Sequence, residues 1–167
     1  VHRFLDEFFL RMTRVIFDHH GTIDKFLGDG LLAFFGDPLP MEDHAEAALK
    51  ASLDMQREMA KLSAEWAASG LSEFKEGVQI RVGINTGMVI VGDLGSGRRV
   101  EYTVVGSAVN IASRLQSHAP PGGIMMTART RALIKNSPAC EGPETIRVKG
   151  MERGVEVYRI YPESINT

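Results

Sequence analysis

Cysteine is almost absent from this sequence, since Cys140 is the only one among 167 residues. A single cysteine cannot close an internal disulfide or build a cysteine-based zinc site, which fits a reducing compartment. Long apolar runs are missing as well: none approaches the ~20 residues needed to span a bilayer. The net charge of −2 gives no general attraction to nucleic acid or to an anionic membrane, so any recognition of phosphate must be local.

The sequence also lacks an initial methionine. It begins at Val1, inside a helical pattern and without a signal peptide. These features suggest a cytoplasmic piece of a longer protein. The sequence does not reveal the other regions of that protein, such as a membrane anchor or an upstream regulatory domain. With 44% apolar and 24% charged residues, residues 1–167 are expected to form one globular domain with a real core.

Apolar periodicity predicts the order helix, hairpin, helix, hairpin, helix. Helical spacing of apolar residues predicts helices over 3–19, 42–68, 107–117 and 128–135. Alternating or continuous apolar runs predict strands over 23–27, 31–35, 79–85, 88–91, 102–105, 124–126, 145–148 and 155–160. This order indicates an α+β fold with helices on one face of a mostly antiparallel sheet. A ferredoxin-like core normally begins with a strand, and that first strand is absent here.

Asp29 lies between two glycines at the predicted turn of the first hairpin. A carboxylate in such a turn can approach Mg²⁺ or Mn²⁺ without competing side chains, and these hard cations prefer oxygen ligands. The same Gly-Asp-Gly sequence is also simply good turn chemistry, and Lys25 is equally explained as a charge on an exposed strand position. Both explanations stay open at this point.

Asn110 and Arg114 form a stronger pair, because their spacing places both on one face of the predicted helix. The guanidinium fork suits phosphate oxygens, and the amide can fix a sugar or a base. Arg81 lies on the polar face of a strand, and Lys149 follows an apolar residue near the end of the chain. A solvated helix face and ordinary surface charges are the alternative explanations for these four residues.

The glycine-rich segment 92–97 is similar to a phosphate loop but lacks the Gly-Lys-Ser/Thr ending of a Walker A motif. No helical pattern follows it. We therefore interpret residues 93–99 as a flexible connection between two strands.

Taken together, the motifs resemble the catalytic domain of class III adenylate and guanylate cyclases. The resemblance covers roughly 140 residues in order; it rests on Lys25 to Gly30, Phe35-Gly36, Arg81 to Gly87, Val91 to Gly95, Glu101 to Gly106, Val109 to Leu115 and Val148 to Gly150. It implies a ferredoxin-like, palm-type βαββαβ cyclase homology domain without its first strand.

The resemblance implies that Lys25 and Thr103 read the purine. A Lys/Thr pair resembles the adenine-selective subclass, whereas a guanylate cyclase would typically carry Glu and Cys. Lysine, which only donates hydrogen bonds, suits the ring-nitrogen acceptor of adenine. Asn110 would orient the ribose, and Arg114 would stabilise charge at the reacting phosphate.

By the same resemblance, Arg81 and Lys149 would hold the β- and γ-phosphates, and Asp29 would be the second of two metal-binding aspartates. The implied reaction is attack of the ATP 3′-hydroxyl on the α-phosphorus, giving cyclic AMP and pyrophosphate, with two Mg²⁺ or Mn²⁺ ions per site. Such sites form at a homodimer interface, where Asp29 and Arg81 of one chain would face the other five residues of its partner.

Family members carry the first metal aspartate on the strand that this sequence lacks. We therefore expect residues 1–167 alone to have little or no cyclase activity. Two alternatives remain: a catalytically silent dimerisation or regulatory module of the same fold, and a ferredoxin-like nucleic-acid binder. The intact residue set disfavours the first, and the low net charge disfavours the second.

Overall fold

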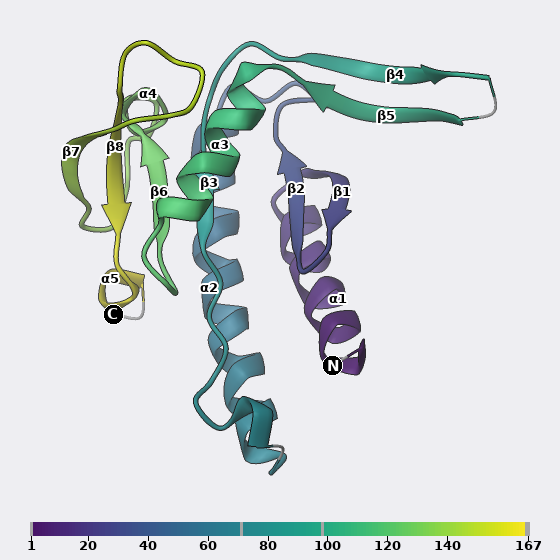
Figure 1. Ribbon diagram of the computed structural model, residues 1–167, viewed down its shortest axis with the longest axis vertical. Coiled ribbons are helices and arrows are strands. Elements are labelled where there is room, and N and C mark those ends of the chain that lie inside the picture. Colours follow the sequence, from purple (N-terminus) through teal and green to yellow (C-terminus); the bar gives the residue numbers. More distant parts are fainter. Residues whose placement is uncertain (1, 71, 98, 166–167) are drawn as a thin grey trace.

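The computed structural model describes residues 2–70, 72–97 and 99–165, in which helices lie beside three separate pieces of sheet (Figure 1). The helices are α1 (His2–Asp18), α2 (His44–Ala68), α3 (Ser107–His118), α4 (Ala128–Ala132) and α5 (Pro162–Ile165), with a 3₁₀ turn η1 at Ser72–Phe74. The strands are β1 (Thr22–Leu27), β2 (Gly30–Phe34), β3 (Val82–Ile84), β4 (Ile90–Ser96), β5 (Arg99–Val105), β6 (Ile124–Thr127), β7 (Glu141–Ile146) and β8 (Val155–Ile160). The predicted α+β class is confirmed.

Helices α1 and α2 pack against each other, because each carries apolar residues at helical spacing. Phe4, Phe8 and Met12 of α1 share one buried cluster with Met59 and Leu62 of α2. Figure 1 shows α1 and the longer α2 running side by side, with α1 leading directly into the first hairpin. This pair of helices therefore sets the position of β1 and β2.

A four-stranded sheet has the order β3-β6-β8-β7. Only β3 and β6 are parallel, and the other neighbours are antiparallel. All four residues of β6 are buried, so both faces of this strand need cover. Ile124 and Met126 pack in the cluster that contains α2, whereas Met125 packs in the cluster that contains α3. Helices α2 and α3 therefore cover opposite faces of β6, whereas the sequence predicted helices on one face of the sheet.

The second hairpin is longer than the sequence predicted. Strands β4 and β5 pair from Ile90↔Val105 to Ser96↔Arg99, so the segment that was expected to be a flexible connection is mostly strand. Backbone ladder hydrogen bonds do not depend on side chains, so glycines at 92 and 95 do not stop the register from propagating. Figure 1 shows the resulting two-stranded ribbon reaching away from the rest of the molecule.

Most other boundaries agree with the prediction to within a few residues. Strand β3 is shorter than the expected 79–85, and β7 covers 141–146 rather than 145–148. The alternation that was expected over 79–85 survives outside the strand, since Gln79 and Arg81 are exposed while Ile80 and Val82 are partly buried. Arg81 thus lies on the polar side of this segment, as its pattern indicated.

Candidate functional site

The first hairpin carries Lys25 and Asp29. Lys25 pairs with Leu32 of β2, and its side chain is exposed. Asp29 lies in the turn between Leu27 and Gly30, also exposed, beside Gly28 in the left-handed region at φ 61°. A residue with a Cβ would be strained at Gly28, so the glycine makes the tight turn that presents Asp29 to solvent.

Asp24, one residue before Lys25, connects this hairpin to the second one. Its two carboxylate oxygens accept hydrogen bonds from Thr103 Oγ1 at 2.8 and 3.0 Å. Its Oδ2 also accepts the backbone N–H of Val104 at 3.1 Å. Lys25 and Thr103, which are far apart in the sequence, are therefore carried by adjacent segments of β1 and β5.

A second carboxylate contacts β5 one residue earlier. The Tyr102 hydroxyl donates a hydrogen bond to Asp37, and the Tyr102 ring lies 6.4 Å from the ring of Phe34. The hydrogen bond to Asp37 raises the pKa of Tyr102 from its ordinary value of 10.0 because it stabilises the protonated phenol. Asp24 and Asp37 together hold β5 against the first hairpin and the loop after it.

Asn110 and Arg114 are both exposed on α3, one turn apart. The opposite face of the helix is fixed by Leu115, which is fully buried against Met125 and Val157. Close backbone contact also holds the helix: a Cβ at Gly83 of β3 would lie 2.4 Å from the Ala112 carbonyl oxygen. This packing leaves the amide and the guanidinium free to face a ligand.

Lys149 and Arg81 are exposed at two further points of this region. Lys149 directly follows Val148, which is buried in the same cluster as Leu115 of α3. Arg81 directly precedes β3, the strand on which α3 packs. The segments that carry Arg81 and Lys149 thus border α3, through β3 and Val148 respectively, whereas Asp29 lies in the turn of the first hairpin.

One carboxylate does not make a metal site. No group of three or more His, Cys, Asp or Glu side chains among the described residues is arranged to hold a metal ion. Asp29 offers the hard oxygen that Mg²⁺ or Mn²⁺ prefers, but the described residues do not bring two further His, Cys, Asp or Glu side chains to it. The residues present therefore do not fit a complete two-metal centre, and the steps proposed below concern only the side chains of this chain.

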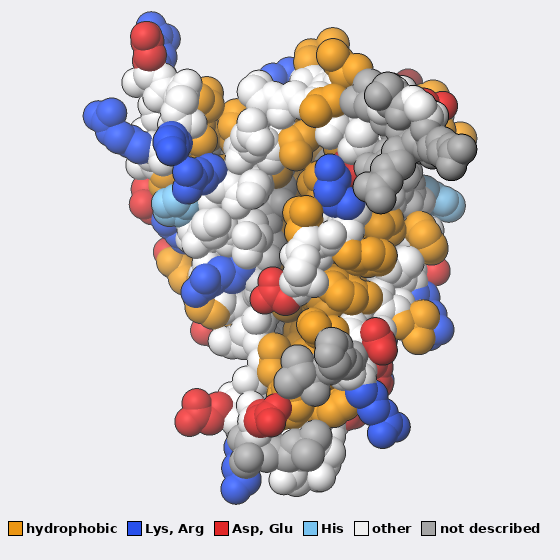
Figure 2. All heavy atoms as spheres, turned by 45° about the vertical axis from the view of Figure 1, so that its right-hand side comes forward, with side chains coloured by type: hydrophobic (Ala, Val, Ile, Leu, Met, Phe, Trp, Pro, Cys, Tyr) orange, Lys and Arg blue, Asp and Glu red, His pale blue; other side chains and the backbone are white. Residues whose placement is uncertain are grey.

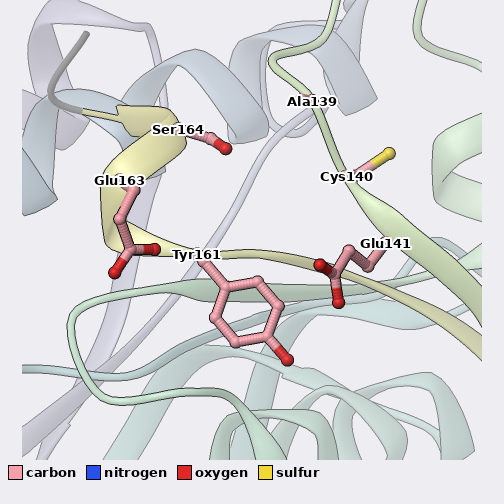
Figure 3. A pocket seen from close by; sticks show the side chains of 6 residues that line it. All are labelled: Ala139, Cys140, Glu141, Tyr161, Glu163 and Ser164. Carbon is pink, nitrogen blue, oxygen red and sulfur yellow. The ribbon is translucent and has the colours of Figure 1, made fainter.

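A cavity of about 420 Å³ lies away from these residues. Figure 3 shows its lining, which comes from the segment that leads into β7, from Tyr161 after β8 and from α5: Ala139, Cys140, Glu141, Tyr161, Glu163 and Ser164. Two of these residues are acidic and none is basic. Its charge disfavours a triphosphate, and no candidate site residue lines it.

Asp24 is the residue that the sequence prediction missed. The available signal was a carboxylate next to Lys25 in an otherwise apolar strand, a position where no turn or helix cap needs it. Its partner on β5 is 79 residues away, so the contact becomes visible only once the two hairpins are placed.

Comparison with known proteins identifies the family. The family model described as "Adenylate and Guanylate cyclase catalytic domain" matches residues 1–162. Adenylate cyclase 1 of Rhizobium meliloti (strain 1021) is 31% identical over 158 residues, which are 93% of this chain and 23% of that protein. The chain thus spans about a quarter of the length of this curated relative.

Two solved structures are similar over nearly the whole chain. The adenylyl cyclase CyaB from P. aeruginosa is 36% identical with a TM-score of 0.88, covering 96% of this chain and 81% of that chain. The guanylyl cyclase Cya2 is 33% identical with a TM-score of 0.86, covering 94% and 78% respectively.

The chain therefore belongs to the adenylate and guanylate cyclase catalytic domain family. A further similar structure, the guanylate cyclase domain of RhGC from Catenaria anguillulae, was solved in complex with GTP; it is 25% identical with a TM-score of 0.78, covering 94% of this chain and 81% of that chain. In the part of the chain that the structure describes, no helix has both the length and the apolar character needed to cross a membrane.

Proposed function

We propose that this domain is the catalytic domain of an adenylate cyclase, which converts ATP into 3′,5′-cyclic AMP and pyrophosphate in signal transduction. The observation that carries the proposal is the contact of Asp24 with Thr103, because it joins the segments that bear the two purine-reading candidates. The family contains both adenylate and guanylate cyclases, so the assignment to ATP depends on Lys25 and Thr103.

Lys25 and Thr103 match the hydrogen-bonding edge of adenine. The lysine ammonium only donates, which suits a ring nitrogen that accepts. The threonine hydroxyl can accept from the exocyclic amino group. Thr103 is half-buried and Lys25 is exposed, so both remain accessible to a base that enters from solvent.

The helix face of α3 supplies the next contacts. Asn110 orients the ribose so that its 3′-hydroxyl faces the α-phosphorus, and Arg114 stabilises the negative charge that develops on the phosphate oxygens. In the proposed homodimer, Lys149 of this chain and Arg81 of the other copy hold the β- and γ-phosphates. The bond from the 3′-oxygen to the α-phosphorus forms as the bond to the β-phosphate oxygen breaks, and pyrophosphate leaves. Positioning and electrostatics supply most of the rate in such phosphoryl chemistry.

A homodimer completes the site in this proposal. Large apolar side chains stay exposed on the elements around β1, β2, β4 and β5; they are Phe26, Leu27, Met88, Ile90, Tyr102 and Val105. Figure 2 shows hydrophobic side chains gathered in a band on the face that is turned forward, with a few charged side chains among them. An apolar surface of this kind typically marks a protein–protein interface, and a second copy of the chain is the partner that we propose.

Because the described residues supply only Asp29 as a candidate metal ligand, we propose that full activity requires the longer parent protein. Comparison of residues 1–167 with the parent protein, by cyclic AMP formation from ATP with Mg²⁺ or Mn²⁺, tests this point. Turnover by the parent and little by residues 1–167 is the expected result. A parent protein that is inactive on ATP would favour a silent regulatory module instead.

The assignment to ATP is tested by exchanging the purine-reading pair in the parent protein. Lys25→Glu combined with Thr103→Cys should lower the ratio of kcat/KM for ATP to that for GTP, because the new side chains no longer complement adenine. The loss of two hydrogen bonds corresponds to a change on the order of 10- to 100-fold. An unchanged ratio would show that the purine pocket is misassigned.

A further inference from the structure

We propose that Asp24 is a positioning residue that sets the purine selectivity of this site. Its carboxylate accepts the hydrogen bond of the Thr103 hydroxyl, so Thr103 can only accept a hydrogen bond from the base. This inference rests on the proposed adenylate cyclase function and adds to it a residue that does not itself contact the nucleotide.

The geometry fixes the direction of the hydrogen bond. Both oxygens of Asp24 lie within 3.0 Å of Thr103 Oγ1, and the Val104 N–H donates to one of them at 3.1 Å. An ionised carboxylate can only accept, and a threonine hydroxyl has a single proton. Thr103 therefore donates its hydroxyl hydrogen bond to Asp24.

The consequence concerns the two purines. Adenine carries an amino group at position 6, a donor, where guanine carries a carbonyl oxygen, an acceptor. A free threonine hydroxyl can rotate and serve either group. A hydroxyl that donates its hydrogen bond to Asp24 can still accept one from the adenine amino group. Towards the guanine oxygen it offers only lone pairs, so the two oxygens repel each other.

A β-bulge explains how the side chain reaches β5. The pairing of β1 with β2 shifts between Ile23 and Lys25, which leaves Asp24 as the extra residue. Such bulges re-aim a side chain out of the regular alternation. Asp24 is half-buried against β5, while its neighbour Lys25 is exposed.

Space for a base edge remains beside Thr103. Its partner across the second hairpin is Gly92, and a Cβ built at Gly92 would meet no atom within 4 Å. Directly opposed residues of an antiparallel pair lie on the same face. The absence of a side chain at Gly92 thus leaves the approach to the free lone pairs of Thr103 open.

The test compares two variants of the parent protein, each of which removes one carboxylate hydrogen bond to β5. Asp24→Ala leaves the Thr103 hydroxyl free to rotate and to donate a hydrogen bond to the guanine oxygen. We therefore expect the ratio of kcat/KM for ATP to that for GTP to fall about tenfold, the equivalent of one hydrogen bond. Tyr102→Phe is the matched control, because it removes the contact with Asp37 without touching Thr103. The control should leave the ratio unchanged.

The outcomes separate this inference from the proposed function. A wild-type protein that prefers GTP, or that turns over neither nucleotide, contradicts the proposed function, and the inference fails with it. A wild-type protein that prefers ATP, with an unchanged ratio in Asp24→Ala, overturns the inference alone. Equal falls in Asp24→Ala and Tyr102→Phe also overturn it, since they would reflect the general loosening of β5.

A measurement on the folded wild-type protein decides the matter if Asp24→Ala does not fold. Purine riboside triphosphate has no group at position 6, and inosine triphosphate has the carbonyl oxygen of guanine without its amino group. The wild type should use purine riboside triphosphate better than inosine triphosphate, in part because Lys25 suits the accepting nitrogen at position 1. Because the hydroxyl hydrogen of Thr103 is engaged by Asp24, Thr103→Val should narrow that difference. An unchanged difference in Thr103→Val would overturn the inference.

Discussion

Two neighbouring residues of β5 make hydrogen bonds to carboxylates from the first third of the chain. Thr103 donates to Asp24, and Tyr102 donates to Asp37. The two contacts differ in exposure: Thr103 is half-buried, and the Tyr102 phenol lies at the surface. A surface hydrogen bond contributes little to stability. The Thr103 contact instead engages the hydroxyl hydrogen of a side chain that we place in the purine pocket, so we expect it to affect recognition of the base.

The raised pKa of Tyr102 predicts a dependence of stability on pH. Because hydrogen bonding to Asp37 raises the folded-state pKa above 10.0, the contribution is fully present below that value and is lost as the pH rises through the folded-state pKa. Chemical unfolding of the wild type and of Tyr102→Phe below and above pH 10.0 measures it. The difference in stability between the two proteins should shrink at the higher pH. A constant difference would show that the phenol proton is not involved.

Asp29 allows a clean separation of catalysis from folding. Its side chain is exposed in the turn of the first hairpin. Asp29→Ala should abolish metal-dependent turnover in the parent protein while changing the free energy of unfolding by less than about 0.5 kcal/mol. Cyclic AMP formation and thermal unfolding measure the two effects. Retained turnover would remove Asp29 from the proposed metal site.

Among the elements, the contact between α3 and β3 positions the proposed ribose and phosphate groups. A Cβ at Gly83 would lie 2.3 Å from the Gln116 nitrogen and 2.4 Å from the Ala112 oxygen. Both are backbone atoms, which cannot move aside as a flexible side chain can. The helix that carries Asn110 and Arg114 thus rests directly on a strand that has no side chain at this point.

Gly83→Ala should therefore destabilise the domain and displace α3. We expect a loss of about 1–3 kcal/mol or more, as for other overpacked positions. Gly92→Ala is the control, since a Cβ there would meet nothing within 4 Å, and its stability should change little. Denaturant unfolding of both variants provides the comparison. Equal stability of Gly83→Ala and the wild type would mean that α3 can shift without cost.

At the scale of the whole molecule, the exposed apolar band is the feature that points beyond a single chain. Ile90 is 69% exposed and Met88 is 88% exposed, both near the base of the second hairpin. Isolated exposed apolar residues need no explanation, but a contiguous group of them does. Burial in a homodimer would remove this surface from water.

Ile90→Glu should weaken that homodimer. A charge placed in an apolar interface without a partner costs several kcal/mol of association free energy, so the variant should be monomeric where the wild type is dimeric. Leu133→Glu is the control, because Leu133 is 53% exposed but follows α4, away from the band. Sedimentation velocity measures both. A monomeric wild type, or equal dissociation of both variants, would contradict the proposed interface.

The sequence predicted the helices, the first hairpin and the α+β class because these depend on local periodicity. The apolar spacing in α2 and the glycine-flanked Asp29 are visible within a short window of sequence, and the structure places both elements as expected. The extent of β4 and β5 was wrong, because glycines 92 and 95 have local preferences for turns that the ladder between the two strands overrides.

The sequence by itself determined which candidate site groups are present: two lysines, two arginines, one threonine, one amide and one carboxylate, in the order of a nucleotide cyclase. Only the tertiary structure decided that Asp24 meets Thr103 and that Gly83 lies against the backbone of α3. The physical reason is the distance along the sequence over which each interaction acts. Helical and turn preferences act over a few residues, whereas a hydrogen bond between two hairpins depends on the packing of every element that lies between them in the chain.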